Sequence, residues 1–421
     1  MNNVLYFTLI FLTTYTDSFL TPYFGAFGFS LLPIISYILF IIRFLAGNRK
    51  TVRHPFPFFF IKLVNYSFSL SFLLYIIFIC LGMQTTYYGS DLIMKAIRLY
   101  MTFTSYVLFI YVLVDIMRCM KIEDVFKPFF YINIFLAIFG IVEYSRIPNA
   151  FLNLHYAMDD VYYRVRLLTQ ESSHTAPLIE VFFIMATYYA LYIRKSRIHF
   201  VITLVCLCSQ IYITSSKSFM VVLGVSLVFG LWETIKTSRY KGVMVVCSLG
   251  LLMLFYHFFY HGLVNSFQGD IDNSTSTATR LTSNLSGYLM GITIPCGVGF
   301  GGYLYFLPKF ITFIMDQLPS ILDKTELWSM LKSKDDKSIA AQSFFSQSST
   351  YWGCIGVILF ARYLFSLCSD FLKYVNPKHK ALFKTVFCVI FLNLSISTGL
   401  DFVYLAVLAI AIHIINQKIY I

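Results

Sequence analysis

The chain has 421 residues, of which 58% are hydrophobic and only 12% are charged, and its mean hydropathy is +0.73. A soluble domain is about 25% charged, so this composition excludes a water-soluble fold. It predicts an all-α membrane protein, because continuous apolar runs cross a bilayer as helices whereas a barrel would show short alternating strands. The net charge of +12 comes mainly from basic residues in short connectors, which is typical of cytoplasmic loops and not of nucleic-acid binding.

The apolar runs predict about twelve membrane spans in a single membrane domain, residues 1–421. In chain order they are 2–17, 23–46, 56–82, 96–118, 127–143, 173–193, 199–214, 218–235, 242–261, 346–368, 381–398 and 401–417. Basic residues gather in alternate connectors, at 49–53, 118–127, 194–197, 236–241 and 373–384. Because cytoplasmic loops carry an excess of lysine and arginine, we expect these connectors and both termini on the cytoplasmic side. The first residues lack the basic region and cleavage site of a signal peptide, so none is expected.

Two outward segments are long enough to hold a functional site. One is 144–172, and the other is the large loop 262–345, which contains a Ser/Thr/Asn run ending at Arg280 and then the glycine string GVGFGG. The string lacks the lysine and hydroxyl residue of a phosphate-binding P-loop. We expect instead that its glycines allow a tight, non-helical backbone where the loop dips into the membrane; these are Gly297, Gly299 and Gly301.

Four basic residues on the outward side are candidates for binding a ligand: Arg164, Arg166, Lys217 and Arg280. The later lysines of the large loop alternate with carboxylates and are expected to form a solvated face; they are Lys324, Lys332, Lys334 and Lys337. Arg146 is a further outward cation, but Glu143 lies three residues before it and predicts a helical ion pair. Lys217 has a second interpretation, in which its long side chain only extends to the membrane surface. Cations that converge at an outer membrane surface suit a phosphate or diphosphate, since the planar fork of arginine binds two oxygens at once.

The sequence TQESSHT, residues 169–175, begins the sixth predicted span. Its hydroxyls and carboxylate fit the first turn of a helix, and a helix N-terminus at the outer surface is also an anion site. Glu171 and His174 are three residues apart and share a helical face, so either can serve as a general base. Glu180 follows inside the span, where a carboxylate usually faces a polar interior or a packed neighbour.

No metal or cofactor site is expected. His257 and His261 share a helical face, but they lack the glutamate of a zinc-protease helix and a third ligand. The nine cysteines are scattered, mostly within apolar runs, without the spacing of a disulfide framework or a zinc site.

Four motifs, in this order, resemble the bacterial O-antigen polymerase (Wzy) and O-antigen ligase superfamily over about residues 140–365. They are an arginine before an outward Glu-Ser pair (Arg164 or Arg166, then Glu171 and Ser172), the tight turn SSKS (215–218), an arginine early in the large loop (Arg280), and the string PCGVGFG (295–301). The resemblance implies a GT-C-like fold in the inner membrane, with the segments 144–172 and 262–345 in the periplasm.

The resemblance also implies an activity. Such enzymes join undecaprenyl-diphosphate-linked oligosaccharide repeats into O-antigen or a related surface polysaccharide, without a cofactor, alongside a flippase and a chain-length regulator. Glu171 would be the first choice for general base and His174 the second. The diphosphate would be bound by Arg164, Arg166, Lys217 and Arg280.

Alternatives to a polymerase remain. A ligase would transfer glycan to lipid A-core, but ligases of the superfamily carry a histidine in the second half of the large loop, and here none occurs between His261 and His379. A polysaccharide or lipid-linked glycan transporter predicts internal repeats and contacts at the membrane midplane, whereas the polar residues here cluster towards one face. A non-catalytic scaffold leaves the outward cations unexplained.

Overall fold

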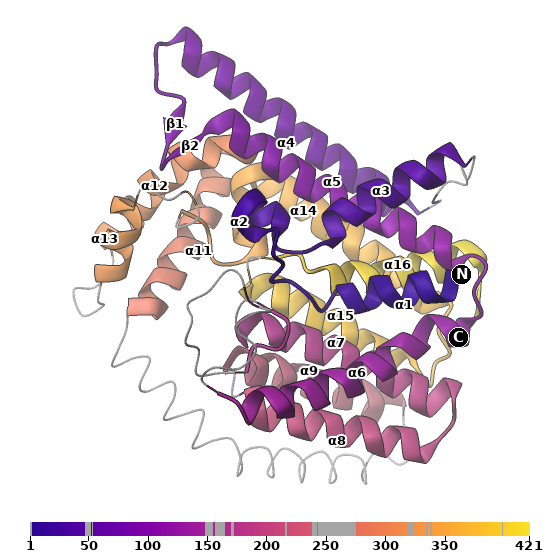
Figure 1. Cartoon of the computed structure of the whole chain (residues 1–421). Coiled ribbons are helices and arrows are strands. Elements are labelled where there is room, and N and C mark those ends of the chain that lie inside the picture. The colour runs from indigo at the N-terminus through magenta and orange to yellow at the C-terminus, as the bar shows by residue number, and fades with distance from the viewer. Residues whose placement is uncertain are drawn as a thin grey trace.

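The computed structural model describes residues 2–46, 52, 54–147, 155, 165–169, 172–214, 217–237, 242, 275–317, 324–333, 336, 339–397 and 399–421. They form a bundle of helices with one short hairpin (Figure 1). Among these residues, six helical segments are long and apolar enough to cross a membrane. They are α4 (Pro55–Cys80), α5 (Leu92–Met117), α6 (Ile122–Tyr144), the segment His174–Ile193 of α7 (Ser172–Tyr188) and η3 (Tyr189–Ile193), α8 (Arg197–Thr214) and α14 (Phe344–Lys373). The all-α membrane class is thus confirmed in its coarse form, and the count of about twelve spans stays a prediction.

Further helices complete the bundle. Three are apolar, namely α1 (Asn2–Leu12), α3 (Leu32–Leu45) and α16 (Phe402–Gln417), and α9 (Lys217–Thr237) and α15 (Lys380–Ile396) pack against each other. Every residue of α16 from Phe402 to Ile414 is buried, against α5, α14 and α7. A helix surrounded on all sides has to be apolar all round, which explains its unbroken hydrophobic sequence. The predicted span 242–261 lies, apart from Gly242, outside the described residues.

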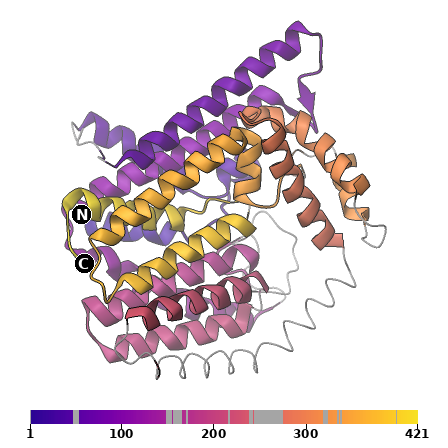
Figure 2. The same cartoon turned by 180° about the vertical axis from the view of Figure 1, so that it is seen from behind.

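Both termini lie at the same end of the bundle, which we call the termini end (Figures 1 and 2). The connections α3–α4, α5–α6, η3–α8 and α14–α15 are also there. These are connections in which the sequence concentrates its basic residues, so the charge pattern predicts their grouping. The opposite end, called the loop end, carries the hairpin of β1 (Thr86–Tyr87) and β2 (Ser90–Asp91) together with α11 (Thr275–Thr293), α12 (Gly299–Gln317) and α13 (Thr325–Lys332). The short α2 (Thr21–Phe24) and η1 (Gly25–Gly28) link α1 to α3.

Side-chain caps define where several helices begin. The carboxylate of Asp91 accepts hydrogen bonds from the backbone N–H groups of Ile93 and Met94, at 2.9 and 3.3 Å, and so starts α5 directly after β2. At the termini end, Nδ1 of His54 accepts from the N–H of Phe56 at 3.2 Å, and Pro55 occupies the first helical position of α4. Both arrangements satisfy amides that have no partner within the helix.

The large segment 262–345 is mostly helical in its described part, and its position between membrane spans stays a prediction. The Ser/Thr-rich run from Thr275 becomes the start of α11, which packs along α14, while α12 packs against α4 and α5. Small residues allow the approach of α11 to α14: a Cβ added to Gly287 would lie 2.3 Å from Ser346 Oγ, and one added to Gly291 would lie 2.7 Å from Ser349 Cβ. Close packing through small residues is common between membrane helices.

The glycine string spans the connection between α11 and α12 and the first turn of α12: Gly297 and Val298 lie between the helices, whereas Gly299 and Gly301 belong to α12, so the predicted non-helical backbone does not extend over the whole string. Gly297 and Gly299 have φ of +74° and +71°, a region that favours glycine. Added Cβ atoms would lie 2.4 Å from the carbonyl oxygen of Tyr351 for Gly297, and 2.2 Å from that of Leu92 for Gly301. The facing helix α14 is interrupted at Gly353, where φ is +67° and ψ is 177°. The turn therefore docks where α14 is broken, between α4, α5 and α14.

Candidate functional site

The structure places the sequence-predicted site residues in different surroundings. Arg164 and Glu171 lie outside the described residues, and Lys217 forms the first residue of α9. Arg166 is buried with 2% exposure, and His174 is half-buried in the first turn of α7. Arg280 is exposed on α11.

Arg166 belongs to a buried turn, residues 165–169, which is tied to two helices. The N–H groups of Arg166 and Leu167 donate to the carboxylate of Glu143 at the end of α6, at 3.0 and 2.8 Å. The carbonyl of Arg166 accepts the hydroxyls of Thr169 and Thr175, at 2.8 and 3.0 Å, and Thr175 lies on α7. Leu167 has φ of +49°, an uncommon conformation for a side chain of this size. These bonds fix the turn between the end of α6 and the start of α7.

Glu143 therefore has a different partner from the predicted one. The spacing predicts a helical pair with Arg146, but both carboxylate oxygens of Glu143 accept backbone amides of the 165–169 turn. Glu143 is 1% exposed, so its carboxylate is a structural element of the turn. Glu143 and Arg166 are more than 20 residues apart along the chain. Helical spacing predicts only contacts between residues three or four apart, so it cannot predict this one.

His174 lies near a carboxylate that the sequence analysis did not select. Asp401 precedes α16, and α16 packs against α7. Burial raises the pKa of Asp401, and the nearby imidazole of His174 acts in the opposite direction. Asp401 also interacts electrostatically with the buried hydroxyl of Tyr404, which lies one turn into α16. One signal for it existed in the sequence, since Asp401 is the acidic residue of the outward turn near Gly399.

A buried polar contact continues inward from His174 along α7. Glu180 is fully buried, and the side-chain amide of Asn393 on α15 donates to its Oε2 at 3.2 Å. The sequence allows two interpretations of Glu180, and the structure shows the hydrogen bond to a neighbouring helix. The second carboxylate oxygen, Oε1, has no hydrogen-bond donor among the described residues.

Arg280 is connected to this region only through the packing of α11. Ser346 Oγ donates to the carbonyl of Asn284 at 2.7 Å, so the first turn of α14 contacts α11 one turn beyond Arg280. The N–H of Phe344 donates to the carbonyl of Ser397 at 2.6 Å, in the connection that leads to Asp401. Among the described residues, no hydrogen bond or ion pair joins Arg280 to Arg166 or His174. The structure therefore joins the backbone of Arg166 to Thr175, the residue after His174, whereas Arg280 lies on α11, which packs against α14.

Several ion pairs lie at the termini end. Asp115 pairs with Arg43 and Arg118. Glu233 pairs with Lys236 and Lys384, at 3.1 and 2.5 Å. Lys373 pairs with Asp370 at 2.7 Å. Many of the basic residues that produce the charge bias are thus neutralised locally, and we interpret them as structural.

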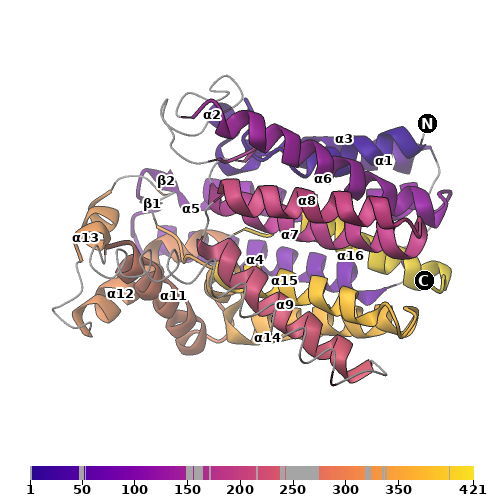
Figure 3. The ribbon, with the colours of Figure 1, turned by 90° about the horizontal axis from the view of Figure 1, so that it is seen from below.

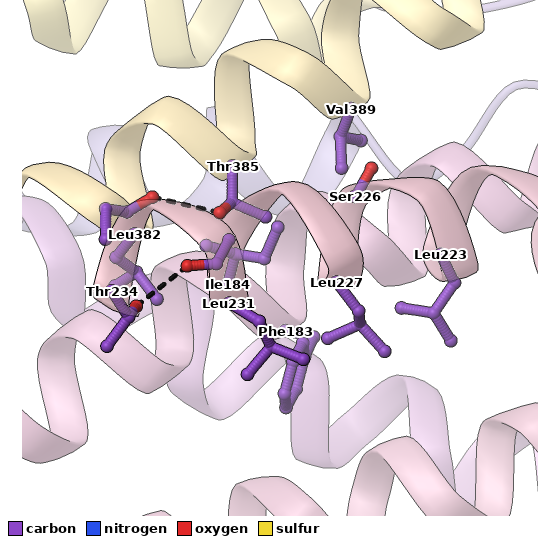
Figure 4. A pocket seen from close by; sticks show the side chains of 12 residues that line it. Phe183, Ile184, Leu223, Ser226, Leu227, Leu231, Thr234, Leu382, Thr385 and Val389 are labelled. Atoms are coloured by element: carbon purple, nitrogen blue, oxygen red, sulfur yellow. Dashed lines mark hydrogen bonds between the residues drawn. The ribbon is translucent and has the colours of Figure 1, made fainter. Parts of the chain in front are cut away.

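A cavity of about 170 Å³ lies between α7, α9 and α15 (Figure 4). Phe183, Leu223 and Leu227 contribute hydrocarbon to its wall. The hydroxyls of Thr234 and Thr385 donate to carbonyls of their own helices, at 2.8 and 2.9 Å. The hydroxyl of Ser226 also lies in the wall and has no hydrogen-bond partner among the described residues. The rest of the wall is mostly hydrocarbon, which suits an apolar chain.

Within the described ranges, no group of three or more His, Cys, Asp and Glu side chains is arranged to hold a metal ion. The cysteines of these ranges are free thiols: Cys80, Cys119, Cys206, Cys208, Cys296, Cys354, Cys368 and Cys388. Comparison with protein-family models, curated proteins and solved structures finds no match to this chain. The resemblance to O-antigen polymerases therefore rests on the motifs themselves.

Proposed function

We propose that this chain is a membrane glycosyltransferase that polymerises undecaprenyl-diphosphate-linked oligosaccharide repeats at the outer face of an inner membrane. The observation that carries the proposal is the arrangement at the start of α7, where Thr175 bonds to the buried 165–169 turn and the preceding residue, His174, lies near Asp401. This arrangement combines a predicted diphosphate-binding segment with a titratable base. It is at the end of the bundle opposite the paired basic residues, which agrees with an outward site.

In the proposed reaction, a hydroxyl oxygen of one repeat attacks the anomeric carbon of a second, lipid-linked chain. The bond between that carbon and the diphosphate oxygen breaks, and undecaprenyl diphosphate leaves with the electron pair. The hydroxyl proton passes to the general base, Glu171 or His174. Preorganised cations stabilise the negative charge that develops on the leaving group.

The burial of Arg166 supports different roles for the cations, with one cation holding the segment in place and the others contacting the substrate. Its backbone bonds to Glu143, Thr169 and Thr175 hold the turn, so Arg166 would position the segment that contains Arg164 and Glu171. Arg164, Lys217 and the exposed Arg280 would then contact the diphosphate. His174 is the candidate base that the structure describes, and it lies near Asp401 at the start of α16.

The apolar cavity supports a lipid-linked substrate. Lys217 begins α9, and the cavity wall starts six residues later at Leu223, which is about 9 Å along a helix. A diphosphate bound near Lys217 would direct its polyprenyl chain along α9 towards this cavity. The hydrocarbon wall of Figure 4 would then hold part of the chain.

Purified protein incubated with a defined lipid-linked repeat, with and without a chelator, tests the proposal. Oligomers formed from lipid-linked repeats alone support a polymerase, whereas transfer only after lipid A-core is added identifies a ligase. Arg280→Ala and Glu171→Ala should each abolish long-chain product while the protein still reaches the membrane. Near-normal chain ladders in both variants contradict the site assignment, and His174→Ala shows which residue is the base.

A transporter is the second candidate, and two observations favour it. The helix α14 is broken at Gly353, and transporters often bind substrate where membrane helices are discontinuous. Glu180 is a buried carboxylate with one oxygen that lacks a donor among the described residues. A flipping assay in liposomes with a fluorescent lipid-linked repeat separates the two functions, since flipping without new glycosidic bonds would establish transport.

A further inference from the structure

A hollow of about 310 Å³ lies at the loop end, between the β1–β2 hairpin, α12 and α13. These elements are neighbours in Figures 1 and 3. Its wall includes Tyr88, Lys309, Thr312, Trp328 and Lys332. The volume is at the lower limit of small-molecule sites, which begin at about 300 Å³. The hollow is separate from the turn that contains Arg166 and from the cavity between α7, α9 and α15.

Two aromatic side chains border this hollow. Trp328 is 48% exposed, and a large apolar ring on a protein surface commonly marks a contact site when it belongs to a patch. Tyr88 and Gly89 form the two-residue turn of the hairpin with φ of +52° and +75°, a turn type that favours asparagine or glycine at both positions. A tyrosine in this conformation costs about 1 kcal/mol or more. This conformation places Tyr88 in the wall of the hollow. Strained backbone is common at binding sites, so the conformation agrees with a binding role for Tyr88.

Two lysines give the hollow a positive charge. The Nζ atom of Lys309 lies 3.5 Å from the centre of the Tyr305 ring, and that of Lys332 lies 6.0 Å from the centre of the Trp328 ring. Among the described residues, neither lysine forms an ion pair with a carboxylate. The nearby Asp336 pairs with Lys95 at 2.7 Å. The hollow therefore combines an exposed indole with two cations.

We propose that this hollow is a binding subsite for an acidic saccharide. The C–H face of a sugar ring is apolar and packs on the negative face of an aromatic ring, here Trp328 with Tyr88 at the rim. A carboxylate or phosphate on the sugar pairs with the ammonium groups of Lys309 and Lys332. The inference rests on the proposed function for its biological meaning, in which the subsite holds the acceptor glycan, but saccharide binding is measurable without turnover.

The test uses the full-length protein in phosphatidylcholine nanodiscs and isothermal titration with a trigalacturonate, with maltotriose as the neutral comparison. We expect trigalacturonate to bind more tightly than maltotriose. Trp328→Ala and the double variant Lys309→Ala with Lys332→Ala should each weaken trigalacturonate binding by about tenfold or more, a loss that titration measures directly. Trp328→Phe keeps an aromatic face and should retain most of the affinity.

Trp232 provides a matched control. It is 58% exposed and has Lys236 at 5.3 Å above its ring, so it reproduces the Trp–Lys pair away from the hollow. Trp232→Ala should leave binding unchanged. Equal losses in the Trp232 and Trp328 variants, or no binding of trigalacturonate by the wild type, would overturn the proposal.

Two further outcomes distinguish saccharide binding from lipid binding and from polymerisation. If nanodiscs containing phosphatidylglycerol change the exposure of Trp328 and trigalacturonate does not bind, the hollow is a lipid-headgroup site and the saccharide proposal is wrong. If trigalacturonate binds through Trp328 but lipid-linked repeats are not polymerised, the subsite stands and the proposed polymerase function fails.

Discussion

Gly353→Ala should uncouple the α11–α12 turn from α14, which is the junction that shapes the loop end. A Cβ at Gly353 would lie 1.9 Å from the carbonyl oxygen of Pro295 and 2.6 Å from the backbone nitrogen of Gly297. Both are backbone atoms, so no side-chain rotation can relieve the contact. The substitution therefore acts on the docking of two segments and not on a flexible surface.

The magnitude has two parts. Gly353 has φ of +67° and ψ of 177°, a region that is almost restricted to glycine and costs about 1 to 3 kcal/mol for other residues. In addition, Pro295 must move by about 1.5 Å to restore an ordinary contact of 3.4 Å from the present 1.9 Å, and packed interiors resist such shifts. We expect a total of about 3 to 5 kcal/mol, in the range that identifies a specific structural defect.

Gly82→Ala is the matched control. Gly82 has φ of +66°, but a Cβ there would meet no atom within 4 Å, so only the conformational cost of about 1 to 2 kcal/mol applies. Thermal melting in detergent should show a much larger loss for Gly353→Ala, and trypsin should cleave more readily after Arg280 on α11. Equal melting midpoints for the two variants would refute the packing argument.

Three further predictions concern the α7 region. Burial raises the pKa of Asp401 in the folded protein. Protonated Asp401 therefore adds to the free energy of unfolding below its unfolded pKa of about 4, and this contribution is lost as the pH rises through the folded pKa. Asp401→Asn should therefore melt higher than the wild type at about pH 8 and nearly equally at about pH 4, and a lower midpoint at about pH 8 would contradict this assignment. Glu143→Ala removes the acceptor of two buried amides and should cost about 2 to 4 kcal/mol. Thermal melting should show a smaller loss for Glu143→Gln, which keeps one acceptor. Leu227→Trp fills the cavity of Figure 4. The yield of saccharide oligomers from lipid-linked repeats should fall several-fold while the melting midpoint changes little. An unchanged yield would argue against a lipid chain in the cavity.

The membrane class and the role of the glycine string could be predicted because both depend on local chemistry. Long apolar runs cannot satisfy their backbone in lipid except as helices, and glycines in close succession allow tight backbone. The start of α11 was expected to be a loop because its residues are mainly serine and threonine. Further along the same helix, Gly287 and Gly291 allow close contact with α14, and this tertiary packing outweighs weak helix propensity.

The contacts that define the candidate site could not be predicted in the same way. Glu143 reaches the amides of Arg166 and Leu167, and Asp401 lies near His174 although the two are far apart along the chain. Such pairs depend on which helices are neighbours, and no periodic pattern within one helix contains that information. The break at Gly353 is similar: α14 looks like a continuous apolar span, and the interruption follows from the backbone that packs against it.

Helix orientation adds an argument for an anionic ligand at the loop end. The helices α7, α9, α14 and α16 all begin there and run towards the termini end (Figure 1). Each N-terminus carries a partial positive charge from unsatisfied amides, and Asp401 makes no side-chain hydrogen bond that caps α16. The C-termini of the same helices point to the end where acidic residues pair with lysine and arginine. The positive potential for a diphosphate would thus come from backbone dipoles as well as from arginine.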